Sequence, residues 1–328
     1  MTSFVGNAAA RAAFRAALSG AQLHHAWLIA GPEGIGKARF ARAAAMRMLA
    51  EAAGATDLAG DFEVPEANAT RRMIEAGAHP DYRVLERLAK DPEKKPGQDI
   101  ARSIKIDQVR GLNPMFATKP SMSMRRVVVI DSIDDVERPG AANALLKNLE
   151  EPPVGTIFLL VSHSPGRLLP TIRSRCRLLR FDPLSDEDVA AVLRAELPEA
   201  SAAEIDALVR AGDGSPGKAL GFAGLDIATL DKEMAAIAAR GDPDNLIRAR
   251  LAKALGVKAA QPRYEAFLAR VPAFIATQAR GRQGPGLAQA LDAYAAASQL
   301  GPLAIAQSLD AQGTVFEMGG ILARLANR

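Results

Sequence analysis

One short segment constrains the fold of this 328-residue chain more than any other. Residues 31–37 read Gly-Pro-Glu-Gly-Ile-Gly-Lys, which fits the pattern G-x-x-x-x-G-K. An apolar run at residues 26–29 precedes it, and residues 38–53 have helical spacing. This pattern is typical of a turn between a strand and a helix whose backbone N–H groups surround phosphate groups. The predicted nucleotide-binding residues are Gly31, Gly34, Gly36 and Lys37.

Strand-like and helix-like segments alternate through the first half of the chain. The runs at 126–131 and 156–161 are typical of strands covered on both faces. Strands separated by helices indicate a parallel sheet with right-handed crossovers. We therefore predict an α/β fold, with a parallel sheet and helices on both faces. Shorter strands are predicted at 82–85 and 178–181, helices at 7–18, 106–118 (interrupted at Pro114) and 139–149, and irregular structure at 54–80.

The second half is rich in alanine, which costs little in a helix. The pattern changes near Asp182, and from Ser185 to the end we predict only helices. Helix breaks are predicted at Gly241-Asp242-Pro243, Gln261-Pro262, Gly284-Pro285-Gly286 and Gly301-Pro302.

Composition sets further limits. Lys and Arg number 41 against 37 Asp and Glu, so the net charge of +4 is too small to demonstrate nucleic-acid binding. A single cysteine excludes an intramolecular disulfide and a cysteine-rich zinc site. The first 20 residues lack the continuous apolar stretch of a secretion signal, and no run of about 18 apolar residues predicts a membrane span. We expect a cytoplasmic protein.

Two catalytic groups are missing around the phosphate loop. Ala38 stands where a Ser or Thr hydroxyl would bind magnesium. Asp131 fits the carboxylate that holds the metal, but Ser132 follows it where ATPases of this class usually carry a glutamate that polarises water. Two interpretations stay open: the loop is a packing turn, or it binds ATP or ADP without efficient hydrolysis. We do not expect ATPase activity from this chain alone.

A block of arginines lies between Pro152 and Phe181, where the sequence has no Asp or Glu. Such a run is often a solvated face. Here it includes the more specific text Thr-Ile-Arg-Ser-Arg-Cys at 171–176, after a predicted buried strand that ends in Ser-His-Ser-Pro. The arginines are Arg167, Arg173, Arg175, Arg177 and Arg180.

Several motifs together resemble one family. They are GPEGIGK at 31–37, HPDY at 79–82, AANALLKNLEEPP at 141–153, IFLLVSHSP at 157–165 and TIRSRC at 171–176. In this order they resemble the clamp-loader subunits of the AAA+ class, and among these the delta-prime subunits of bacterial DNA polymerase III. The resemblance is dense from about residue 22 to 185 and weak beyond.

The resemblance implies a five-subunit ring that opens a sliding clamp and places it on primer-template DNA, with tau/gamma and delta subunits as partners. It implies that ATP lies at subunit interfaces and that the motif Ser174-Arg175-Cys176 faces a neighbour's ATP, with Arg175 as a trans-acting arginine finger. It also implies that Lys218 is the basic residue which a lid presents to nucleotide, and that Ser162 or His163 stands at a γ-phosphate sensor position. The implied domains are an AAA+ domain (1–182), a helical lid (183–227) and a helical collar (228–328).

The leading hypothesis is a non-hydrolysing structural subunit of the clamp loader. The alternative is an ATP-hydrolysing motor subunit of the tau/gamma type, which Ala38 and Ser132 disfavour. A standalone DNA-binding ATPase of the same superfamily is a third possibility, disfavoured by the low net charge. Many relatives carry four zinc-binding cysteines where residues 54–78 have none, so we expect no zinc.

Overall fold

The computed structural model describes residues 4–20, 23–58, 60–90 and 100–326. The chain divides into two compact units. Unit 1 comprises Met1–Val192 and Gly214–Gly217, and unit 2 comprises Leu193–Asp213 and Lys218–Arg328. The predicted division into residues 1–182, 183–227 and 228–328 stays a prediction.

A five-stranded parallel sheet forms the centre of unit 1, with the strand order β2-β3-β4-β1-β5. Every residue of β1 and β4 is buried, as the uninterrupted apolar runs predict for central strands. The predicted strands are confirmed to within one residue at either end. Their bounds are β1 Ala26–Ala30, β2 Tyr82–Glu86, β3 Arg126–Asp131, β4 Thr156–Ser162 and β5 Arg177–Arg180.

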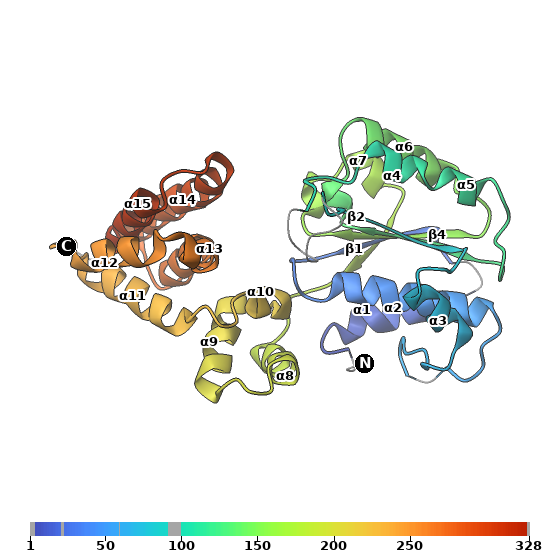
Figure 1. Cartoon of the computed structure of the whole chain (residues 1–328), viewed down its shortest axis with the longest axis horizontal. Coiled ribbons are helices and arrows are strands. Elements are labelled where there is room, and N and C mark those ends of the chain that lie inside the picture. The colour runs from blue at the N-terminus through green and yellow to red at the C-terminus, as the bar shows by residue number, and fades with distance from the viewer. Residues whose placement is uncertain (1–3, 21–22, 59, 91–99, 327–328) are drawn as a thin grey trace. The chain divides into compact units, whose positions relative to one another are not determined.

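Helices cover both faces of this sheet, as predicted (Figure 1). One face carries α1 (Ala8–Leu18), α2 (Lys37–Ala52) and α3 (Ala69–Glu75), and the other α4 (Ile106–Arg110), α5 (Asn113–Phe116), α6 (Gly140–Glu150) and α7 (Pro170–Arg173). Short 3-10 turns are η1 (Ile133–Asp135) and η2 (Pro165–Arg167). On the first face Phe14 packs edge-on against Trp27 and Phe40. On the second, Phe158 belongs to an apolar core shared with α6.

The prediction of irregular structure over residues 54–80 is wrong in part, because α3 forms within it. The side chain of Asn68 accepts hydrogen bonds from the backbone N–H groups of Thr70 and Arg71, which caps the start of the helix. Arg71 then pairs with Glu75 one turn later. These local polar contacts specify a helix that has little apolar periodicity.

The described elements after residue 185 are all helical, as predicted. Helix α8 (Asp186–Glu196) crosses from unit 1 into unit 2, and unit 2 continues with α9 (Ala202–Gly212), α10 (Pro216–Gly221), α11 (Ile227–Arg240), α12 (Leu246–Leu255), η3 (Lys258–Ala260), α13 (Gln261–Ala279), α14 (Gly284–Gln307) and α15 (Ala311–Ala323). Helix α15 packs against α11, α12, α13 and α14. No helix within the described ranges has the length and apolarity needed to cross a bilayer.

The helix break predicted at Gly301-Pro302 is wrong, because α14 continues through it to Gln307. A Cβ atom on Gly301 would lie 3.5 Å from the carbonyl oxygen of Leu268, so α13 and α14 pack closely at this point. Tertiary packing stabilises the helix here and offsets the backbone hydrogen bond that Pro302 cannot make.

Candidate functional site

The predicted phosphate loop connects β1 to α2, and its glycines are required by the backbone. A Cβ atom on Gly31 would collide with the carbonyl oxygen of Phe181, which follows β5. Gly34 and Gly36 have φ values of 76° and 92°, in the left-handed region that glycine adopts without strain. The loop therefore has the conformation that the sequence motif predicts.

The side chain of Lys37 is directed into this loop. It is only 2% exposed, and its Nζ donates a hydrogen bond to the carbonyl oxygen of Pro32. Burial lowers the pKa of Lys37 to about 8, although the charges of Glu33, Asp134 and Asp131 act in the opposite direction. The ammonium that would meet phosphates thus has an acceptor within its own loop.

The residues at the predicted metal position do not fit a magnesium ion. Ala38 offers no oxygen, and the carboxylate of Asp131 forms an ion pair with Arg42 on α2, with 3.2 Å between Oδ2 and Nη2. The same guanidinium lies 2.6 Å from Oε2 of Glu86 at the end of β2. Burial tends to lower the pKa of Arg42, but the hydrogen bond and charge of Glu86 raise it overall. A permanent cation therefore neutralises both carboxylates.

Ser132 and the predicted sensor position are bonded within unit 1. The Ser132 hydroxyl is buried and donates to the Asp135 carboxylate over 3.1 Å. Asp134 accepts from the Ser162 hydroxyl at 3.1 Å and from the backbone N–H of His163 at 2.6 Å. Asp134, which the sequence placed in a surface turn, is half-buried and joins the ends of β3 and β4.

The outer side of the loop is covered by a four-residue segment of unit 1. The hydroxyl of Ser215 donates to the carbonyl oxygen of Glu33 at 2.8 Å, and the Gly217 N–H donates to that of Gly34 at 2.9 Å. A Cβ atom on Gly217 would lie 2.9 Å from the Cα of Gly34. The loop is thus a packing element of unit 1. Lys218 follows as the first residue of unit 2 after this segment.

The predicted arginine finger lies at the surface after α7. About a third of the Arg175 side chain is exposed. One guanidinium nitrogen donates to the carbonyl oxygen of Thr171 at 2.9 Å, and another lies 2.7 Å from Oε1 of Glu150 at the end of α6. The Ser174 hydroxyl also donates to Thr171, at 3.2 Å. Glu150, which the sequence did not single out, fixes where Arg175 points.

Cys176 completes this motif as a packing residue. It contacts the apolar core on the α6 side of the sheet. Burial raises the pKa of its thiol to about 12, so the thiolate needed for nucleophilic or redox chemistry does not form at neutral pH.

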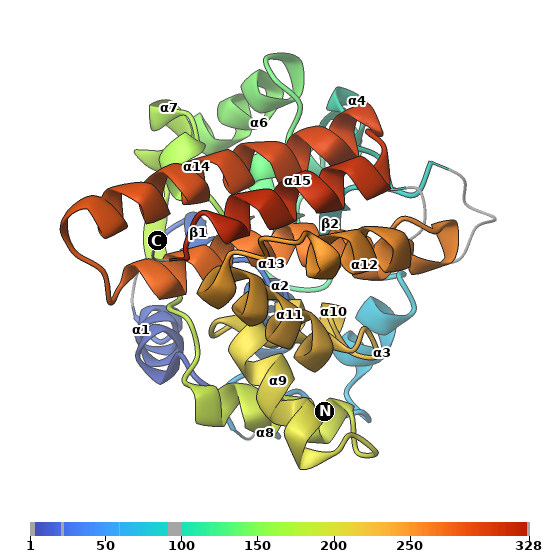
Figure 2. The same cartoon turned by 90° about the vertical axis from the view of Figure 1, so that its left-hand side faces the viewer.

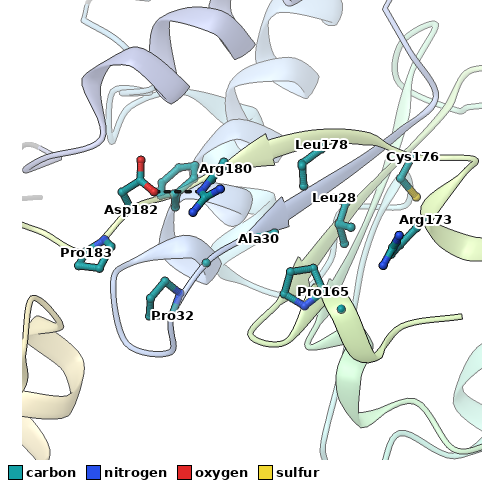
Figure 3. A pocket seen from close by; sticks show the side chains of 13 residues that line it. Leu28, Ala30, Pro32, Pro165, Arg173, Cys176, Leu178, Arg180, Asp182 and Pro183 are labelled. Atoms are coloured by element: carbon teal, nitrogen blue, oxygen red, sulfur yellow. Dashed lines mark hydrogen bonds and ion pairs between the residues drawn. The ribbon is translucent and has the colours of Figure 1, made fainter. Parts of the chain in front are cut away.

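A cavity of about 640 Å³ adjoins the motif on the same unit. Figure 3 shows Leu28 and Leu178 on its floor, between Pro32 and Pro183 at one end and Arg173 and Cys176 at the other. Neither Arg175 nor Lys37 is among the residues that line it. The sequence gave no sign of this cavity, because its walls come from strand ends far apart along the chain.

The chain was compared with known proteins and structures. It is 36% identical over 197 residues to DNA polymerase III subunit delta' of Pseudomonas aeruginosa, covering 60% of this chain and 55% of that protein. It is 31% identical over 267 residues to subunit gamma/tau of Mycobacterium bovis, covering 72% and 42%. A solved gamma subunit-related protein from Thermotoga maritima has 17% identity and a TM-score of 0.45, covering 96% of this chain and 98% of that one.

The chain spans about half the length of the curated relatives it matches. A protein family described as "DNA polymerase III, delta subunit" matches residues 6–185, which is more than half of the chain. The matched region coincides with the motif-rich part of the sequence, so the resemblance to delta-prime subunits is confirmed. The chain belongs to the DNA polymerase III delta subunit family.

Proposed function

We propose that this chain is a non-hydrolysing structural subunit of a bacterial DNA polymerase III clamp loader. In this role it helps to open a sliding clamp and place it on primer-template DNA, together with tau/gamma and delta subunits. Its family and its delta' relatives support this assignment. We place it in the cytoplasm, with residues 1–182 as the AAA+ domain, 183–227 as the lid and 228–328 as the collar.

The ion pair between Arg42 and Asp131 is the observation that carries the non-hydrolysing part of this proposal. A guanidinium in contact with the carboxylate competes with a divalent ion, and Ala38 supplies no second oxygen. Ser132 cannot replace a carboxylate as general base at neutral pH. The contact of Lys37 with Pro32 and the cover of Ser215 and Gly217 favour a packing role for the loop over binding of ATP or ADP.

We also propose that Arg175 acts on the nucleotide of a neighbouring subunit. A guanidinium stays charged at every physiological pH and can neutralise charge on a γ-phosphate. Arg175 is partly exposed, and its pair with Glu150 is solvent-accessible, so exchanging that carboxylate for a phosphate costs little. Thr171 and Glu150 hold the side chain near one orientation before the neighbour arrives.

The test is ATP turnover by the ring reconstituted with the partner motor and delta subunits. With Arg175→Ala we expect turnover to fall by about 10³-fold at the one site that this arginine serves, with assembly retained on gel filtration. Arg173→Ala is the matched control, since it removes an exposed arginine two positions away and should leave turnover unchanged. Normal turnover and clamp loading with Arg175→Ala would refute the assignment of the finger.

The alternative is a motor subunit of the tau/gamma type, a class to which the chain is also similar in sequence. The purified chain alone decides between the two. We expect no ATP hydrolysis above background, and no change on Lys37→Ala. Hydrolysis by the isolated chain that disappears with Lys37→Ala would establish the motor alternative instead.

A further inference from the structure

Unit 2 contains a groove at one end of its helices, far in sequence from the phosphate loop. Its volume is about 810 Å³, within the range of ligand sites. The end of α11, the turn before α12, the start of α14 and the end of α15 form its walls. In Figure 2 the start of α14 and the end of α15 lie at the same end of the unit. We name it the helix-end groove.

The helix-end groove is strongly basic. Arg240, Arg248 and Arg324 line it, and no Asp or Glu is among its described lining residues. Arginine at the end of a helix often serves to complement the helix dipole, which is a sufficient reason for Arg240 or Arg324 taken singly. It does not account for three guanidinium groups from three helices meeting at one cavity.

One of these arginines is held rigidly in place. The buried carboxylate of Asp242 accepts from Nε of Arg248 at 3.2 Å and from two backbone N–H groups at the start of α12. A side chain on Gly319 would collide with the stem of Arg248, and one on Gly320 would lie 3.2 Å from its Nη1. The glycine pair of α15 thus makes room for the guanidinium, while Arg240 and Arg324 stay exposed.

The first turn of α14 adds further positive potential. Pro285 and Gly286 line the groove, and Gln283 makes no side-chain cap to this 24-residue helix. The N–H groups of an uncapped first turn and the positive end of the helix dipole favour an anion. The side-chain amide of Gln289, on the next turn, is a further donor in the wall.

From this convergence we propose that the helix-end groove binds phosphoryl groups. Guanidinium groups match phosphate oxygens in bidentate geometry, and several cations around one cavity suit a ligand with several phosphates. No aromatic side chain is among the described lining residues, so bases have no platform on which to stack. The ligand is therefore held by its phosphates, which come either from a free polyphosphate or from the backbone of single-stranded nucleic acid, without base preference.

The experiment uses the full chain and two probes, a fluorescein-labelled oligothymidine followed by anisotropy and tripolyphosphate followed by calorimetry. The double variant Arg240→Gln/Arg324→Gln removes two exposed charges from the groove. The matched control, Arg210→Gln/Lys253→Gln, removes two exposed charges from elsewhere in unit 2. Thermal unfolding by circular dichroism establishes that both variants fold.

We expect the groove variant to bind at least about tenfold more weakly than the control at low ionic strength. The slope of log K against log salt should fall by about two for oligothymidine. Loss of binding to both probes identifies phosphoryl groups from either source, and loss for oligothymidine alone identifies the nucleic-acid backbone. Equal binding by the two variants, or no binding of either probe to the wild-type chain, overturns the proposal.

Discussion

At the scale of single residues, Lys37 combines deep burial with a positive charge. Its pKa of about 8 lies below the ordinary value of 10.5, so between these pH values the folded chain binds fewer protons than the unfolded chain. The free energy of unfolding therefore rises with pH across this window, and at neutral pH the chain bears the full cost of the buried charge.

Lys37→Met removes that cost. We expect the free energy of unfolding to increase on the order of 2 kcal/mol at neutral pH, and the gain to shrink as the pH approaches about 10. Urea denaturation at the two pH values measures both effects. Lys119→Met, at an exposed site, should show no such trend. An equal loss of stability at both pH values would mean that the contact with Pro32 outweighs the cost of burial.

Individual site residues differed in how well the sequence predicted them. The glycines of the loop were predictable, because a left-handed turn imposes its requirement on the residue itself. The pairing of Arg42 with Asp131 was not, since the two residues are 89 positions apart and meet only when α2 packs on β3. The pairing of Glu150 with Arg175 likewise depends on where α6 ends.

At the scale of elements, the start of β2 is tied to the turn before β3 by Asp81. This carboxylate is 1% exposed and accepts hydrogen bonds of 2.9 Å from the backbone N–H groups of Ser121 and Met122. It fixes the connection that delivers the chain into β3, and so into Asp131.

We expect Asp81→Asn to lower the free energy of unfolding by about 2 kcal/mol, because an amide supplies one neutral acceptor oxygen in place of a charged carboxylate. Chemical denaturation measures the loss. Asp57→Asn, at an exposed position outside this connection, is the control and should change stability by less than about 0.5 kcal/mol. Equal stability of the two variants would show that the turn before β3 is held by other contacts.

The elements themselves followed from the sequence wherever burial sets the pattern. The apolar runs of β3 and β4 fixed those strands to within one residue. Helix α3 escaped prediction because its cap at Asn68 and its Arg71–Glu75 pair carry the signal, not an apolar stripe. Helix α14 passes Gly301-Pro302 because its contact with α13, invisible in local sequence, stabilises the continuous form.

At the scale of the whole molecule, the chain leaves unit 1 after Val192 and returns to it for Gly214–Gly217. Gly217→Ala places a methyl group against the backbone of Gly34, so we expect unit 1 to lose about 1–3 kcal/mol of stability. Trp27 is the only tryptophan of the chain and is buried in unit 1, so its fluorescence follows the unfolding of that unit alone.

Gly221→Ala is the control for this substitution. It lies in the same helix, α10, and an added Cβ meets no atom within 4 Å. Alanine there should be neutral or stabilising by up to about 1 kcal/mol, since it has the higher helix propensity. If Gly217→Ala leaves the midpoint of the Trp27 transition unchanged, the returning segment does not contribute to the stability of unit 1.

The pair between Arg42 and Asp131 has a consequence for unit 1 as a folded body. A strand end neutralised by a dissolved ion or nucleotide is only as stable as the supply of that ligand allows, by mass action. A guanidinium on the same chain is present at an effective concentration set by the fold, and dilution does not remove it. The carboxylate at the end of β3 therefore keeps its counter-charge when cellular nucleotide and divalent ions run low.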